Sequence, residues 1–374
     1  NANTTGSQNV AVGAGALDNN TTGSLNTACG RDALTANTTA SGNEAFGYGS
    51  LGNNTTGSPC TAIGTSALSS NTTGGSNVAV GYQALSANTT ASSNTAVGRQ
   101  ALGSNTTGSG NTAVAQYALQ DNTTGNNNTA MGYGALGDAN TNNGVAIGYD
   151  ALRACSSGDG NSSVGFQSLT ACTTGSSNAA LGIYALVAVT TGQKNIGISG
   201  FSGGSITTGS NNICLGYDSG KSNSPSGNIT TGSNQICLGN DNTTDLFCAD
   251  TSISASDSRD KTDVASFNIG LDWINALRPV TYKWDKRSWY GTDETPYGTP
   301  DGSKKQSKVN IGFLAQEALE VEKANGYGDN NDNMLVCNLT EDGMRYGMKY
   351  ERLVPILVNA IKELSAKVKA LEAG

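Results

Sequence analysis

Over its first 245 residues the chain repeats one arrangement of polar and apolar positions every 17 residues. Each repeat opens on the polar tetrad Asn-Thr-Thr-Gly or a close variant, continues with a short run such as Asn-Thr-Ala-Val-Gly, and ends on Ala-Leu. The leucines show the spacing most clearly: Leu17, Leu34, Leu51, Leu68, Leu85, Leu102, Leu119 and Leu136. A fixed period of this length, with one small structural unit per repeat, indicates a solenoid.

The residues of each repeat favour β-structure over helix. Two short runs alternate with turns rich in Asn, Gly, Ser and Thr, and no segment has a helical period over about ten residues. The sequence therefore predicts a parallel β-roll with one coil per repeat. The residue before the repeated glycine is usually apolar, as at Val12 and Ile63, and we expect this row to point inward. The spacing loosens after residue 140, and the last clear coils are 208–216 and 231–239.

A different pattern begins after residue 255. Residues 256–374 resemble an ordinary globular domain, and we expect 246–255 to be a linker between it and the solenoid of residues 1–245. Near the C-terminus, apolar residues recur at alternating spacings of four and three: Tyr350, Val354, Leu357, Ile361, Leu364, Val368 and Leu371. This heptad seam predicts a coiled-coil helix over about 350–372. Its Val/Ile and Leu positions by themselves favour two strands, a weak preference that the globular part can overrule.

Charge is divided as unevenly as hydrophobicity. The net charge is −8, but only five of the 21 Lys and Arg residues, and none of the three Trp, lie in residues 1–250. Two different kinds of structure are therefore joined near residue 250. The leucine stack and the scarcity of charge indicate that the sides of the thin rod are buried against other chains. The acidic balance argues against a nucleic-acid partner, and no apolar run is long enough for a membrane helix.

Three features of the repeat have both a structural and a functional interpretation. The Asn-Thr-Thr triplets match glycosylation sites, and a regular threonine array could bind ice, but we favour turn chemistry and stacked side-chain ladders. Cys155 and Cys172 are one repeat apart, and Cys214 and Cys237 occupy equivalent strands. Neighbouring coils would allow a disulfide in each pair, whereas small buried thiols are the interpretation that we favour.

The Asn-x-Ala-Val-Gly pattern resembles the repeats of trimeric autotransporter adhesin heads and of many phage tail fibres. That resemblance covers about two-thirds of the chain. It implies a trimer of left-handed β-rolls, with an intertwined triple β-helix as the alternative.

Four motifs of the C-terminal part, SDSRDK, LRPVTYKW, GFLAQE and YERLVPILVNAIKEL, together resemble the C-terminal intramolecular chaperone family. This is the autocleaving, endosialidase-type peptidase domain at the ends of phage tail spikes and fibres, and the resemblance covers residues 256 to about 371. It implies an α+β domain that trimerises, guides folding of the fibre before it, and then cuts itself off. It assigns Ser256 as the nucleophile and Lys261 as the base of a Ser-Lys dyad.

The composition agrees with this chemistry. The chain has no histidine, so a catalytic serine needs another base, such as a neutral lysine. Because the reference pKa of lysine is about 10.4, burial must lower it by several units, and we expect that burial only in the assembled trimer. Cleavage is expected between Ala255 and Ser256, with the bond after Ser256 as the alternative. Asp257 and Arg259 are expected to hold the loop by a salt bridge or a helix cap.

The sequence thus predicts the C-terminal part of a homotrimeric phage tail fibre, a β-solenoid shaft that ends in a self-releasing chaperone. We expect it to bind a host-surface receptor, with glycan as the ligand class, and other tail proteins through a segment upstream of Asn1. It would assemble in the host cytoplasm and act in the virion, without cofactor, metal, nucleic acid or membrane. No activity on external substrates is expected. Such a clamp would align identical repeats, which otherwise lose little by sliding one whole repeat.

Two alternatives remain open at this point. One is a bacterial trimeric surface adhesin with the same chaperone, and the other is a fibre whose chaperone domain is retained uncut. A spike that degrades polysaccharide is disfavoured, because the acidic residues of the repeats are scattered, whereas glycoside hydrolysis needs two carboxylates facing one bond.

Overall fold

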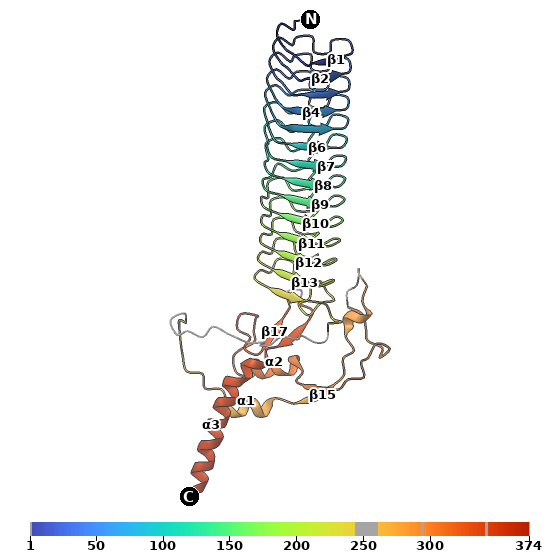
Figure 1. Ribbon diagram of the computed structural model, residues 1–374. Helices are drawn as coiled ribbons and strands as arrows, with labels where there is room; N and C mark the ends of the chain where they lie inside the picture. Colours follow the sequence, from blue (N-terminus) through green and yellow to red (C-terminus); the bar gives the residue numbers. More distant parts are fainter. Residues whose placement is uncertain (1, 244–260, 293–294, 296, 341–342, 374) are drawn as a thin grey trace. The chain divides into compact units, whose positions relative to one another are not determined.

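The computed structural model describes residues 2–243, 261–292, 295, 297–340 and 343–373. It contains two compact units, one of residues 1–225 and 229–240 and the other of residues 226–228 and 241–374. Figure 1 shows the first unit as a stack of coils and the second as helices with short strands. The linker predicted at 246–255 falls on residues outside this description, so its bounds stay a prediction.

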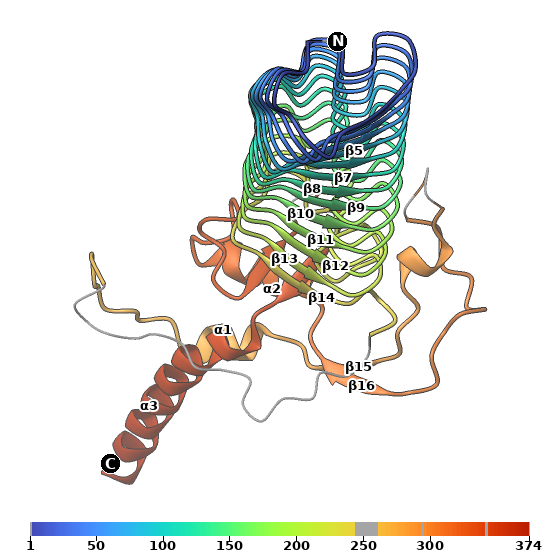
Figure 2. The ribbon, with the colours of Figure 1, turned by 45° about the horizontal axis from the view of Figure 1, so that its top comes forward.

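The first unit is a single sheet of 14 parallel strands, one from each coil. Every strand pairs with the strand of the next coil, so the order in the sheet is the order in the sequence (Figures 1 and 2). The strands are β1 (Val10–Val12), β2 (Thr27–Cys29), β3 (Glu44–Phe46), β4 (Cys60–Ile63), β5 (Asn77–Val80), β6 (Thr95–Val97), β7 (Thr112–Val114), β8 (Thr129–Met131), β9 (Val145–Ile147), β10 (Ser162–Val164), β11 (Ala179–Leu181), β12 (Ile196–Ile198), β13 (Ile213–Leu215) and β14 (Ile236–Leu238). This confirms the predicted β-solenoid, and because both strands of each pair belong to one chain, it is a β-roll and not an intertwined triple β-helix.

The 17-residue period holds nearly to the end of the sheet. The step from Val10 to its partner Thr27 is repeated from coil to coil, except at two places. Between β8 and β9 the step from Thr129 to Val145 is 16 residues, and between β13 and β14 the step is 23 residues. The loosening expected after residue 140 is therefore limited to one shortened coil near that residue and one enlarged coil at the end.

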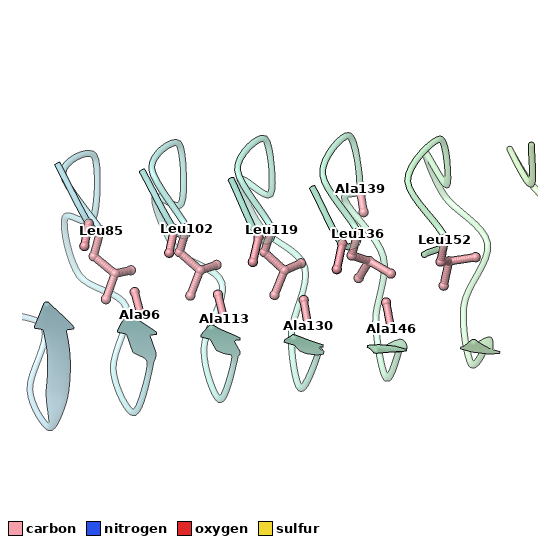
Figure 3. Close-up of a cluster of buried hydrophobic side chains, with 14 of the residues drawn as sticks. Leu85, Ala96, Leu102, Ala113, Leu119, Ala130, Leu136, Ala139, Ala146 and Leu152 are labelled. Carbon is pink, nitrogen blue, oxygen red and sulfur yellow. The ribbon is translucent and has the colours of Figure 1, made fainter. Parts of the chain in front are cut away.

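Alanines and leucines line the interior of the coils (Figure 3). The middle residue of the strand, such as Ala96, is fully buried, and so is the leucine of the same coil, Leu102. The expectation that the residue before the glycine points inward was wrong, because Val12 is 57% exposed and Ile63 is 43% exposed. The leucine fills the narrow interior, so only a methyl group fits opposite it, and the larger strand residues face outward.

The leucine stack is buried within its own chain. The repeated Ala-Leu run is not a second strand, since Leu85 and Leu102 have φ angles of +51°. The chain turns at each leucine and directs the side chain into the coil. A left-handed conformation costs an L-residue about 1–2 kcal/mol, whereas burying a leucine contributes about 1.5–3 kcal/mol. The core therefore holds the turn in place.

Glycine is required where neighbouring coils approach most closely. Gly81 has a φ angle of +137°, and a Cβ atom added there would lie 2.5 Å from the carbonyl oxygen of Gly98 in the next coil. Ala115 and Ser199 occupy the same place in their own coils at φ angles of +111° and +97°. Where a residue with a side chain replaces the glycine, its φ angle is therefore smaller than that of Gly81.

A ladder of buried asparagines runs through the coils at the first position of each tetrad. The side-chain nitrogen of Asn71 donates to Oδ1 of Asn54, one coil earlier, at 2.8 Å and to the carbonyl oxygen of Gly74 at 2.9 Å. The buried members are Asn20, Asn37, Asn54, Asn71, Asn88, Asn105 and Asn122. The predicted side-chain ladders are confirmed, and the same burial leaves no room for a glycan on these asparagines.

The asparagine ladder ends at Asn122, because the next coil has Ala139 at this position. In the described part of the chain, the buried Oδ1 atom of Asn122 has no hydrogen-bond partner. The later coils place thiol or apolar side chains here: Cys155, Cys172, Val189, Ile206 and Ile229. The interior ladder therefore changes from polar to apolar at the shortened coil.

The four cysteines considered for disulfides are free and buried inside the coils. Burial, aided by the neighbouring Cys237, raises the pKa of the Cys214 thiol to about 12. That thiol is therefore protonated at neutral pH and acts as a small buried hydrophobe, which is the interpretation favoured from the sequence.

The ladder predicts a sharp difference between two adjacent residues. We expect Asn54→Ala to lower the free energy of unfolding by about 2–4 kcal/mol, because it removes the donor to Asn37 and Gly57 and the acceptor of Asn71, all in a buried place. Asn53→Ala, at the exposed neighbour, should change it by less than about 0.5 kcal/mol. Urea unfolding followed by circular dichroism measures both, and equal effects would contradict the role of the ladder.

The second unit is a small α+β region that ends in a helix, as predicted. Its elements are α1 (Leu271–Ala276), β15 (Val280–Tyr282), η2 (Arg287–Tyr290), β16 (Asn310–Gly312), α2 (Ala315–Ala324), β17 (Cys337–Leu339), β18 (Tyr346–Met348), η3 (Tyr350–Arg352) and α3 (Leu353–Glu372). β15 pairs antiparallel with β16, and β17 with β18. Trp273, Val336, Leu353 and Ile356 form the centre of its core. Among the helices described, none has the length and apolarity needed to cross a membrane.

Only part of the apolar surface of helix α3 is buried within the chain. Leu353, Ile356 and Ala360 are buried, and the helix packs on α1. The predicted heptad residues lie elsewhere on the helix and are 41–82% exposed: Val354, Leu357, Ile361, Leu364, Val368 and Leu371. The seam is thus uncovered in the single chain, and we call these six residues the helix seam.

Candidate functional site

Lys261 is the predicted site residue that the structure describes, and it is exposed. Ala255, Ser256, Asp257 and Arg259 lie outside the described residues, so the distance between the two members of the dyad stays untested. The single chain does not supply the burial that a lysine base needs.

Two motifs that are far apart in the sequence meet at the β15–β16 pair. Val280 of LRPVTYKW lies opposite Gly312 of the segment NIGFLAQE. Arg278 of the first motif forms an ion pair with Glu317 of the second, since its Nε atom donates to Oε2 at 3.1 Å and its Nη2 atom donates to Oε1. The Glu317 carboxylate raises the pKa of the Arg278 guanidinium. The pair is exposed, so it fixes the orientation of the motifs more than it stabilises the fold.

The third motif, at the start of the C-terminal helix, joins the same place. The hydroxyl of Tyr350 accepts a hydrogen bond from the backbone N–H of Phe313 at 3.2 Å. Their rings lie 6.1 Å apart, within the range of a favourable aromatic pair. LRPVTYKW, GFLAQE and YERLVPIL thus converge, as expected of motifs that belong to one domain.

A small pocket, with a cavity volume of about 10 Å³, lies where the motifs meet, lined among others by Leu277, Arg278, Phe313 and Glu317. Its lining is apolar apart from the ion pair, and none of the lining residues is a serine, cysteine or lysine. The pocket therefore contains no catalytic pair of its own.

A buried carboxylate fixes the segment between α2 and β18. Glu322 on α2 is fully buried, and its two oxygens accept backbone N–H groups of Leu335, Val336 and Cys337 at 2.7–2.9 Å. Three such donors satisfy a carboxylate that would otherwise be costly to bury. Burial and the nearby Glu322 raise the pKa of the Cys337 thiol to about 12. This thiol is therefore protonated at neutral pH, and Glu322 is a structural residue.

Arg278, Glu317 and Glu322 were not predicted from the sequence as residues of the site, although the first two lie in its motifs. Opposite charges in LRPVTYKW and GFLAQE were a visible signal for the ion pair. Glu322 follows Ala318 by four residues on the buried face of α2, and a charge on an apolar helix face indicates a buried partner. Its backbone partners could not be identified from one sequence.

The described residues contain no cluster of three His, Cys, Asp or Glu side chains that could hold a metal ion. The expectation of no cofactor and no metal stays a prediction.

Comparison with known proteins supports the C-terminal part of the prediction. Residues 256–327 match the family described as chaperone of endosialidase, a peptidase family. The matched segment begins at Ser256 and contains Asp257, Arg259 and Lys261. No curated protein and no solved structure matches the chain. The C-terminal segment is thus similar to an endosialidase-type chaperone domain, and it follows a fibre-like β-solenoid.

Proposed function

We propose that the chain forms a trimeric phage tail fibre, with a β-solenoid shaft at residues 1–245 and a self-cleaving chaperone at residues 256–374. The observation that carries the proposal is the order of the two parts. A segment similar to the chaperone of endosialidase begins directly after a solenoid of 14 coils. A chaperone domain at this position would set the register between chains, because nearly identical coils can pair in several registers.

Uncovered apolar surface supports the trimer. On the outer face of the sheet, the last residues of the strands, which precede the repeated glycine or the residue that replaces it, form an apolar stripe: Val12, Phe46, Ile63, Val80, Val97, Val114, Met131, Ile147, Val164, Leu181, Ile198, Leu215 and Leu238. At a rise of about 4.8 Å per strand, the stripe is about 65 Å long, and a width of about 10 Å gives roughly 650 Å². That matches or exceeds the largest apolar patch of a typical monomer, about 300–600 Å².

Stacked aromatic rings extend this surface along the chain. The rings of Tyr117, Tyr133, Tyr149, Phe166, Tyr184, Phe201 and Tyr217 follow one another with centres 5.1–5.7 Å apart. Neighbouring rings contact one another face to face or edge to face, and Tyr133, Tyr149, Phe166 and Tyr217 are still 40–55% exposed. A second copy of the chain offers the same spacing from coil to coil, and it is the occupant that we assign to the stripe and its aromatic ladder.

The cleavage step is assigned to Ser256 and Lys261. Ser256 attacks the carbonyl carbon of Ala255, a neutral Lys261 takes the hydroxyl proton and passes it to the leaving amine, and water then hydrolyses the ester. Cleavage after Ser256 is the alternative. Because Lys261 is exposed in the single chain, neighbouring copies would bury it and lower its basicity, which couples cleavage to assembly. Asp257 and Arg259 would position the loop.

The biological task proposed for the fibre is attachment to a glycan on the host surface, in the virion, with other tail proteins as further partners. A trimeric bacterial surface adhesin that carries the same chaperone is the alternative. The fold of the shaft is compatible with both, since a solenoid by itself defines no ligand.

Native mass spectrometry of the recombinant chain tests the assembly. A trimer of shafts is expected, with the C-terminal segment either cut or intact. A trimer of full-length chains would leave the chaperone as a retained clamp, whereas a monomer at micromolar concentration would contradict both the fibre and the chaperone.

A further inference from the structure

We infer that the C-terminal domain stays bound to the shaft after the chain is cut, through an ion cluster centred on Asp241. The inference rests on the proposed cleavage next to Ser256. That cut places Asp241 in the shaft fragment, and it places Lys286, Ser288 and Arg345 in the C-terminal fragment. The partner of the shaft end is therefore its own severed domain.

Asp241 follows the last strand, β14 (Ile236–Leu238), by three residues, and its side chain is 4% exposed. Arg345 donates to both carboxylate oxygens, from Nη1 to Oδ1 at 2.9 Å and from Nη2 to Oδ2 at 2.7 Å. The Lys286 ammonium lies 3.6 Å from Oδ1 and donates to the backbone carbonyl oxygen of Asp241 at 3.1 Å. The Ser288 hydroxyl donates to Oδ2. A carboxylate gripped at both oxygens by one arginine is among the strongest hydrogen-bonded pairs.

Aromatic rings enclose the two cations. The Arg345 guanidinium lies 5.2 Å from the centre of the Tyr297 ring, and its Nε atom donates to the Tyr297 hydroxyl at 3.2 Å. The Lys286 ammonium lies 5.1 Å from the Trp284 ring and 5.6 Å from the Trp289 ring. These cations are all in the C-terminal fragment and the carboxylate is in the shaft fragment. The two fragments are thus complementary in charge, in a place that water and salt screen weakly.

The compact units agree with this assignment. Residue 241 and residues 226–228, all on the shaft side of the proposed cut, belong to the same compact unit as the C-terminal domain. Cleavage at residue 255 removes one covalent bond but none of the contacts between Asp241 and Arg345, Lys286 or Ser288. In a trimer the three clusters act together, so the severed domains leave slowly.

The test uses a cut that does not depend on self-cleavage. A recognition sequence for a site-specific protease is inserted within 246–255 of the full chain carrying Ser256→Ala, and the digest is separated by size exclusion in about 0.15 M salt. The C-terminal fragment is expected to elute with the shaft. With Asp241→Asn added, its dissociation rate is expected to rise by at least about 100-fold, because Arg345 and Lys286 lose the charge that they share.

Two further variants test whether the effect on dissociation is specific to the contacts of Asp241. Arg278→Met removes the exposed ion pair with Glu317 and should change the dissociation rate by less than about threefold. Arg345→Lys keeps the positive charge but loses the bidentate contact with Asp241. Its dissociation rate should therefore lie between that of the chain with Asp241 and that of the Asp241→Asn chain. Asp241 lies outside the severed fragment, so its substitution leaves the sequence of that fragment unchanged, and circular dichroism of the fragment checks its helix. The inference is overturned if the fragment separates equally fast with Asp241 and with Asn at this position, whether or not the natural chain cuts itself.

Discussion

A chain that carries Ser256→Ala is expected to keep all 374 residues as one polypeptide, whereas the unaltered chain is expected to be cut next to Ser256 as it assembles. Loss of the nucleophile removes the ester intermediate, so the rate of cleavage should fall by roughly 10³-fold or more. Intact mass spectrometry at several times after purification measures the rate. The trimeric state of the shaft should be the same in both chains, because the substitution leaves the chaperone itself in place.

Nearby residues provide the controls for this prediction. Ser258→Ala changes another serine of the same stretch and should leave cleavage unaffected. Lys261→Arg should stop cleavage as Ser256→Ala does, because a guanidinium stays protonated and cannot act as a base, whereas Lys283→Arg should have no effect. Cleavage at an unaltered rate in Ser256→Ala, or in Lys261→Arg, would remove that residue from the dyad.

The second large effect is expected at the helix seam. Leu364→Glu should prevent the chain from forming trimers, because assembly would bring three carboxylates together on the axis of a coiled coil. The dissociation constant of the trimer should rise by at least about 100-fold. Sedimentation equilibrium over a range of concentrations measures it. The same variant should also slow self-cleavage, since Lys261 is exposed unless other copies cover it.

Ala366→Glu is the matched control, since it adds the same charge two residues away, at the position of the heptad that faces away from the seam. Its trimer should dissociate within about threefold of the unaltered chain. Equal loss of trimer in both variants would mean that added charge, and not the seam, is responsible. A stable trimer in Leu364→Glu would show that α3 does not lie on the axis.

The fold could be predicted from the sequence wherever a period was visible. The 17-residue spacing defined the coils, and the heptad spacing defined the C-terminal helix. Alternation in the strands left the choice of face open, because a period of two fits either orientation. The volume of the side chains determines which face points inward, because Leu102 fills the coil and leaves room for Ala96 but not for Val97. The prediction from hydrophobicity alone placed the larger residue inside the coil and was wrong.

Contacts between residues far apart in the sequence could not be predicted, for a different reason. Asp241 and Arg345 are 104 residues apart, and no periodicity links them in a single sequence. The asparagine ladder could be predicted because its members repeat one coil apart, while the enlarged coil before β14 could not be assigned a geometry. The dyad was proposed from a resemblance, and the structure describes only Lys261 of it, so its assignment still depends on the family match at residues 256–327.

The regular coils from β2 to β8 also bear on how the shaft can evolve. Each of these coils presents the same two edges to its neighbours, so loss or duplication of one 17-residue block leaves every junction of the same kind as before. Recombination between the repeated stretches of the gene can therefore change the length of the rod in increments of about 4.8 Å. The shortened and enlarged coils nearer the C-terminus stay outside the exchangeable blocks, so reach can vary while the end that carries the C-terminal domain keeps its architecture.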